Sequence, residues 1–84
     1  MTYRIAWLKR AARDVEALEA EMSSRVRSAV DELATDPRLH GSKKLRGPTG
    51  AYRIRVGDWR VIYEIDDAAK LVTISRVGHR SEVY

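Results

Sequence analysis

Three arginines in a short segment have the residue type and spacing to bind a phosphate. Residues 52–65 alternate between apolar and polar side chains on either side of a central Gly-Asp pair, which suits the two-residue loop of a β-hairpin. Such a loop places Arg55 opposite Arg60 and puts Arg53 on the same face, because successive strand residues point to opposite faces. Like charges directly opposite each other destabilise a sheet. We therefore expect an anion to bind between these side chains.

The chemistry that suits such a site is phosphodiester cleavage. Arginine makes bidentate contacts with phosphate and stays charged at physiological pH. A fixed donor aimed at the charge that builds on a phosphate under attack contributes roughly 10²–10³ in rate. RNA carries its own nucleophile, the 2′-hydroxyl, so a protein needs to supply only phosphate stabilisation and proton transfer. Metal-free RNA cleavage is therefore possible, and a solvated face without a ligand is the alternative.

Other chemistries find little support in the residue types present. The chain has no cysteine, and its two histidines, His40 and His79, do not fall in a cluster at metal-ligand spacing. We therefore predict neither a metal site nor a cofactor. Ser75 lacks a nucleophile elbow, which argues against a serine hydrolase. His79 is interpreted either as a functional residue or as an ordinary surface histidine.

The positive charge is concentrated in the middle of the chain. The net charge is +4, yet residues 37–65 alone hold seven Lys/Arg against two Asp/Glu. Such a distribution indicates contact with a polyanion on one side of the fold. Lys43, Lys44 and Arg46 are candidate contacts to an RNA backbone, and ordinary loop charge is the other interpretation.

Two amphipathic helices should support the hairpin. Residues 3–7 alternate weakly and predict a strand. Apolar residues at three- and four-residue spacing over 8–22 and 26–33 predict helices, each with one apolar stripe. The N-cap of the second helix is expected at Ser23 or Ser24. The helix should end before an Asp-Pro pair, since the residue before proline disfavours the helical region.

The order of elements predicts an α+β fold. Glycine and proline in residues 37–51 indicate a loop, and residues 71–77 form a further strand after the hairpin. The β-α-α-β-β-β order corresponds to a small, mainly antiparallel sheet: an N-terminal strand, a two-helix hairpin on one face, then three C-terminal strands. The arginines would then lie on the uncovered face. We expect one domain over residues 1–84.

Neither a membrane segment nor a secretion signal is expected. No apolar run approaches the roughly 20 residues of a membrane-spanning helix, and residues 1–7 lead directly into a strand pattern without the apolar stretch of a signal peptide. The default expectation is a cytoplasmic protein.

Four segments in order resemble the RelE/ParE superfamily of bacterial toxins. They lie at residues 44–47, 52–55, 59–65 and 77–84, and the last reads Val-Gly-His-Arg-Ser-Glu-Val-Tyr. Resemblance to the RelE branch implies a type II toxin that cleaves mRNA in the ribosomal A site. It also implies a RelB-like antitoxin that holds the toxin inactive.

The resemblance assigns catalytic roles to a set of basic and aromatic residues. They are Arg53, Arg55, Arg60, His79, Arg80 and Tyr84. By this resemblance, the first two contact phosphate or transfer protons, and Arg60 stabilises the scissile phosphate. Arg80 or His79 matches the basic residue after Val-Gly, and Tyr84 stacks on a base or assists proton transfer.

Well-known members carry lysines where this chain has Arg53 and Arg55. Arginine cannot act as a base at neutral pH. Proton transfer is therefore expected from Tyr84, with His79 second and Glu82 as a further possibility.

Two other functions are compatible with the same resemblance. A ParE-like toxin would poison DNA gyrase by binding, without an active site of its own. A catalytically inactive remnant that still binds its antitoxin is the third reading. The arginines and the terminal tyrosine favour the nuclease, because a gyrase binder has no need of a phosphate site.

Overall fold

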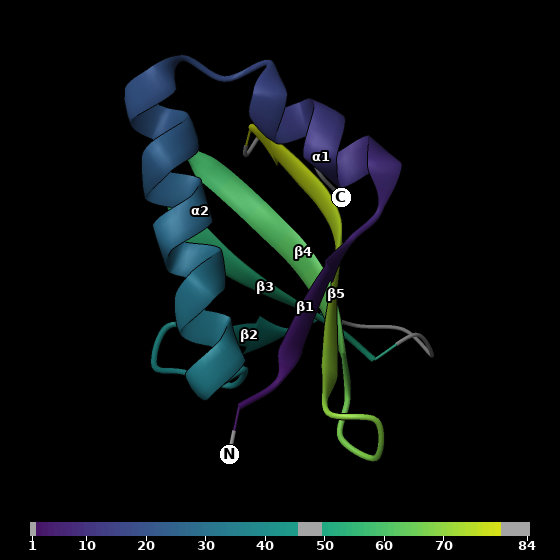
Figure 1. Ribbon diagram of the computed structural model, residues 1–84. Coiled ribbons are helices and arrows are strands. Elements are labelled where there is room, and N and C mark those ends of the chain that lie inside the picture. Colours follow the sequence, from purple (N-terminus) through teal and green to yellow (C-terminus); the bar gives the residue numbers. More distant parts are fainter. Residues whose placement is uncertain (1, 46–49, 80–84) are drawn as a thin grey trace.

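In a computed structural model of the protein, which describes residues 2–45 and 50–79, one mixed sheet carries two helices (Figure 1). The five strands lie in the order β1-β5-β4-β3-β2. The elements are β1 (Arg4–Trp7), α1 (Lys9–Glu16), α2 (Ala20–Thr35), β2 (Lys43–Lys44), β3 (Ala51–Val56), β4 (Trp59–Asp66) and β5 (Leu71–His79). Strand β1 pairs parallel with β5, and every other pairing in the sheet is antiparallel. The predicted α+β fold class is confirmed.

The core forms between the two helices and one face of the sheet. Buried apolar residues of the helices are Ala11, Val15, Val26, Val30 and Leu33, and those of the sheet are Ile54, Val56, Val61, Tyr63, Val72, Ile74 and Val77. The hairpin face predicted to be apolar is therefore the one that the helices cover. Burial of this apolar surface is the main favourable contribution to folding.

Both boundaries between the helices differ from the prediction. Helix α1 ends at Glu16. Helix α2 begins at Ala20, and its N-cap is Glu19, four residues before the earlier of the two expected serines. Leu18 and Met22 both pack against the core although they lie on either side of this start. The apolar stripe continues across the junction, so its periodicity does not mark the break between the helices. Helix α2 ends at Thr35, before the Asp-Pro pair, as expected.

A two-residue strand lies in the segment predicted to be a loop. Lys43 pairs with Arg53 and Lys44 pairs with Tyr52, which adds β2 to the outer edge of β3. A strand of two residues is too short to show an alternation of apolar and polar residues in the sequence. Their strand conformation depends on the hydrogen-bonding edge that β3 offers.

Asp14 of α1 anchors the end of β5. Strand β1 stops at Trp7, in register with Ile74, so the rest of β5 lacks a β1 partner. The Asp14 carboxylate accepts a 2.9 Å hydrogen bond from the Val77 N–H and lies 3.4 Å from Arg76 Nε. This contact holds the part of β5 that runs beside Arg60 of β4.

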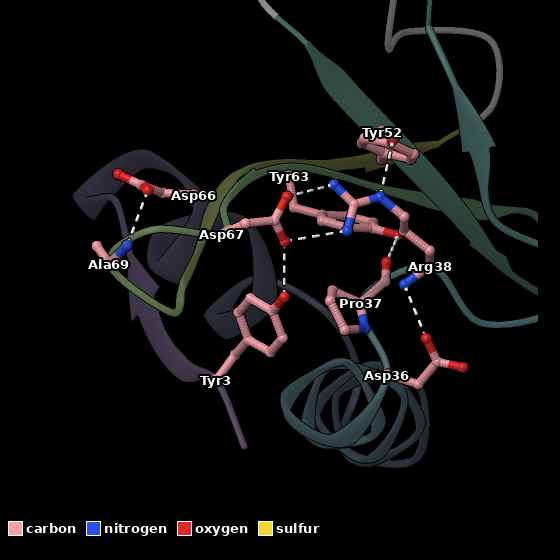
Figure 2. Close-up of polar contacts among 9 residues, drawn as sticks. All are labelled: Tyr3, Asp36, Pro37, Arg38, Tyr52, Tyr63, Asp66, Asp67 and Ala69. Carbon is pink, nitrogen blue, oxygen red and sulfur yellow. Dashed lines mark hydrogen bonds and ion pairs between the residues drawn. The ribbon is translucent and has the colours of Figure 1, made fainter. Parts of the chain in front are cut away.

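Four residues that we call the Arg38 network (Tyr3, Arg38, Tyr52 and Asp67) join distant segments at the other end of the sheet, as Figure 2 shows. Arg38 donates to both oxygens of Asp67, at 3.1 and 2.9 Å, and through Nε to the Tyr52 hydroxyl at 3.1 Å. The Tyr3 hydroxyl donates to Asp67 at 2.6 Å. Hydrogen bonds from Arg38, and then from Tyr3, lower the pKa of Asp67 to about 2.

Tyr63 extends this anchoring into the core. Its ring stacks on that of Tyr52 with 5.9 Å between centroids, and its hydroxyl donates a 2.7 Å hydrogen bond to the Pro37 carbonyl (Figure 2). Burial raises the pKa of the Tyr63 hydroxyl to about 12. The start of β3 is thereby fixed to the segment that follows α2.

Candidate functional site

The β3–β4 hairpin has the register that its sequence predicts. Arg55 lies opposite Arg60, and Arg53 lies opposite Ile62. Of the two turn residues, only the glycine has a positive φ, +61° at Gly57. A type II′ turn requires this conformation at its first central position, and its twist matches that of the flanking strands. The three arginines therefore share the face that points away from the core.

A small cavity lies at the turn end of this arginine face. It has a volume of about 90 Å³ and is lined by Arg55, Gly57, Asp58, Trp59 and Arg60. Two arginines against one aspartate give this lining a net positive charge, which suits a phosphate group that accepts bidentate hydrogen bonds from arginine. The structure thus brings together the two residues whose opposition suggested an anion site.

Arg53 is less accessible than the prediction of an uncovered face implies. It is only 8% exposed, and its Nε atom has no hydrogen-bond partner within residues 2–45 and 50–79. In the sheet it lies between Lys43 of β2 and Ile62 of β4, because β3 has a strand on each side. A buried donor without a partner is costly.

The two loop lysines separate onto opposite faces. Lys43 is in register with Arg53 and therefore joins the arginine face, whereas Lys44 is in register with Tyr52. Both side chains are exposed. Arg46, the third predicted backbone contact, lies outside the described residues.

His79 lies next to Trp59 at the end of β5. The two residues are in register, and their rings meet edge to face with 5.6 Å between centroids. Arg60 is in register with Gly78 instead, so His79 shares the sheet face of Trp59 and not that of Arg60. Trp59 nevertheless lines the arginine cavity. Arg80, Glu82 and Tyr84 fall outside the part of the chain that the structure describes.

Arg76 is a further basic residue on the arginine face, and the alternation of residues along β5 does not predict its place there. Regular alternation along β5 would put Arg76 on the core face with Val72 and Ile74. A register shift between Ile62 and Tyr63 of β4 instead places Arg76 opposite Ile62. A β-bulge of this kind re-aims a side chain by inserting one residue, and the sequence carries no evident signal for it.

The described residues contain neither a metal-ligand cluster nor a membrane-spanning helix. Across residues 2–45 and 50–79, no three His, Asp or Glu side chains gather as metal ligands would. No helix in the same ranges is long and apolar enough to cross a membrane.

Comparisons with known proteins agree on one family. The family described as ParE toxin of type II toxin-antitoxin system, parDE, matches residues 5–84. Toxin RelG of Mycobacterium tuberculosis is 32% identical over 85 residues, which cover 100% of this chain and 98% of the relative. The mRNA interferase toxin RelE of Escherichia coli strain K12 is 28% identical over 88 residues, which cover 100% of this chain and 92% of the relative.

Solved structures show the same fold. The toxin-antitoxin complex RelBE2 of Mycobacterium tuberculosis contains a chain that matches with a TM-score of 0.83 at 33% identity, covering 95% of this chain and 100% of that one. The archaeal RelE-RelB complex of Pyrococcus horikoshii matches with a TM-score of 0.85 at 28% identity, covering 99% and 100%. The first is described as a toxin-antitoxin complex and the second as a complex of RelE with RelB.

Proposed function

Because this chain belongs to the RelE/ParE family and is a toxin of the type II toxin-antitoxin class, we propose that it is an endoribonuclease that cleaves mRNA in the ribosomal A site. The observation that carries this proposal is the cavity between Arg55 and Arg60. The relative from Escherichia coli named an mRNA interferase supports the reaction class. Its substrate lies on the ribosome, so the toxin would act in the cytoplasm.

The proposed reaction uses the nucleophile of the RNA itself. The 2′-oxygen attacks the adjacent phosphorus, the bond from phosphorus to the 5′-oxygen breaks, and the products are a 2′,3′-cyclic phosphate and a 5′-hydroxyl. Arg55 and Arg60 hold the non-bridging oxygens, where negative charge increases in the transition state. Arg53 lies two residues before Arg55 on the same sheet face and is assigned as a further contact to phosphate. No cofactor enters this scheme.

Proton transfer falls to residues other than these arginines, which stay protonated. We assign it to Tyr84 first and to His79 second, with Arg80 as a further contact to phosphate. Lys43, Lys44 and Arg46 would bind the RNA backbone on either side of the scissile bond. Lys43 is the best placed of the described two, since it shares the face of Arg53.

A RelB-like antitoxin is the proposed partner that keeps the toxin inactive. The similar solved structures include the RelBE2 toxin-antitoxin complex and an archaeal RelE-RelB complex. Carboxylates of the antitoxin would neutralise part of the arginine face and exclude RNA from it.

Arg60→Ala tests this function directly. We expect a loss of about 10²-fold or more in cleavage of ribosome-bound message, because a transition-state donor is removed. The fold should remain intact, since the change also relieves the opposition to Arg55. Cleavage is mapped by primer extension, and thermal melts check the fold. Arg10→Ala, which removes an exposed charge from α1, is the matched control.

Full cleavage by a folded Arg60→Ala protein would rule out the proposed site. The family description names ParE, so a DNA gyrase supercoiling assay runs beside the cleavage assay. Inhibition of supercoiling without RNA cleavage would favour the gyrase-poisoning alternative.

A further inference from the structure

Arg25 of α2 lies beside the turn of the β3–β4 hairpin. A Cβ atom at Gly57 would stand 3.7 Å from Arg25 Nη1, 3.8 Å from Nη2 and 3.5 Å from Met22 Cε. Gly57 also lines the cavity between Arg55 and Arg60. A third guanidinium group therefore reaches the turn end of the hairpin from an element about thirty residues away in the sequence.

The Arg25 side chain makes no ion pair or hydrogen bond within the described part of the chain. It is exposed, and Glu21, one helical turn earlier, is not its ion-pair partner despite a spacing that permits such a pair. Arg25, Arg55 and Arg60 thus all lie at the turn end of the hairpin, where Asp58 also lines the cavity, so the charge of these four residues is net positive. Such a position is favourable when an anion is bound.

We propose that Arg25 binds a backbone phosphate of the RNA strand next to the phosphate held by Arg55 and Arg60. This inference rests on the proposed function and extends its binding surface from the sheet onto α2. Arg25 is assigned to binding and not to the chemical step, because it adjoins Gly57 at the turn and does not line the cavity itself.

A purely structural role for Arg25 has a different signature. Its aliphatic stem could simply cover the turn together with Met22, as long basic side chains often do. Arg25→Met keeps an unbranched apolar stem and removes the charge, so it separates the two roles. Arg27→Met is the matched control: Arg27 is an exposed arginine of the same helix, bonds to Ser23 Oγ at 3.3 Å, and lines a different cavity with Leu18 and Asp31.

The experiment measures binding of the full chain to a fluorescent single-stranded RNA whose 2′-hydroxyls are methylated to prevent cleavage. Dissociation constants are determined over a range of salt concentrations. Loss of one phosphate contact to a single strand should reduce the slope of log K against log salt by about 0.7. We expect this reduction for Arg25→Met, partial to full rescue for Arg25→Lys, and a smaller change for Arg27→Met, with equal thermal melts for all three.

Equal affinity and slope for Arg25→Met and Arg27→Met would overturn the assignment of Arg25. A lowered melting temperature for Arg25→Met with an unchanged slope would equally reject it, in favour of the structural role. If Arg60→Ala still abolishes cleavage in either case, the proposed function stands and only this inference fails. A wild-type protein that neither binds nor cleaves RNA would refute both.

Discussion

At the scale of single residues, arginine at positions 53 and 55 limits which side chains can move a proton. A guanidinium can neutralise a phosphate but does not release its proton at neutral pH. His79 is half-buried against Trp59 and lies across the sheet from the face of Arg60. In the proposed mechanism, His79 is therefore the second candidate for proton transfer, after Tyr84.

Two substitutions separate these candidates. Tyr84→Phe keeps the ring and removes the hydroxyl, and we expect it to lower cleavage by about 10²-fold or more, as the loss of a general acid or base does. His79→Gln, which keeps a polar side chain, should have a smaller effect. Rates and pH profiles on ribosome-bound message are the measurement. If both variants keep the wild-type rate and profile, the proton is moved by the RNA or the ribosome.

The hydroxyl of Tyr63 makes stability sensitive to alkaline pH. Burial raises its pKa to about 12, above the ordinary value of about 10, so the folded state retains the proton longer than the unfolded chain. The stabilisation that the protonated Tyr63 hydroxyl contributes is complete below about pH 10 and is lost as the pH rises toward 12.

Tyr63→Phe should remove that pH dependence. At neutral pH the variant should lose about 1–3 kcal/mol of unfolding free energy, because the Pro37 carbonyl loses its buried donor. Urea denaturation between pH 7 and pH 11 measures both effects. A Phe variant that is as stable as the wild type at pH 7, and falls equally at pH 11, would contradict this account.

At the scale of elements, the hairpin separates a face buried in the core from the face that carries the proposed site. Val61 is fully buried and Ile54 is 4% exposed, whereas Ile62, on the opposite face, is only partly buried. We therefore expect the same type of substitution to change the unfolding free energy by different amounts on the two faces.

Val61→Ala and Ile54→Ala should each lower the unfolding free energy by roughly 1–3 kcal/mol, since each leaves a cavity in a small core. Ile62→Ala should cost less, because its surroundings are not enclosed by the helices. Chemical denaturation provides the comparison. Harmless core substitutions together with a damaging Ile62→Ala would mean that the faces are inverted.

At the scale of the whole molecule, the excess positive charge is concentrated in one stretch of the chain. Residues 37–65 contain seven Lys/Arg against two Asp/Glu, and the α2 residue Arg25 adds to the same end of the hairpin. RNA affinity should accordingly fall steeply as the salt concentration rises. The same surface suits an acidic or amphipathic antitoxin.

Binding of the antitoxin should shield Arg55 and Arg60. Arginine-selective chemical modification, read out by mass spectrometry, should label both residues less in the toxin-antitoxin complex than in the free toxin. Arg10 and Arg27, which are exposed on the helices, serve as internal references. Undiminished labelling of Arg55 and Arg60 in the complex would exclude inhibition by direct coverage of the arginine face.

The sequence by itself determined the features that depend on neighbours along the chain. The register of Arg55 against Arg60 follows from a two-residue turn and a period of two, and both act within fourteen residues. The buried face of the hairpin follows from the same alternation. The end of α2 follows from the restriction that proline places on the residue before it.

Only the tertiary structure decided the features that depend on contacts between distant segments. Strand β2 exists because β3 offers it an edge, and β3, flanked on both sides, buries Arg53. The bulge that re-aims Arg76 arises from the pairing of β4 with β5. Arg25 meets Gly57 because α2 packs across the sheet. Local patterns carry no information about such contacts, because each depends on how separate elements pack together.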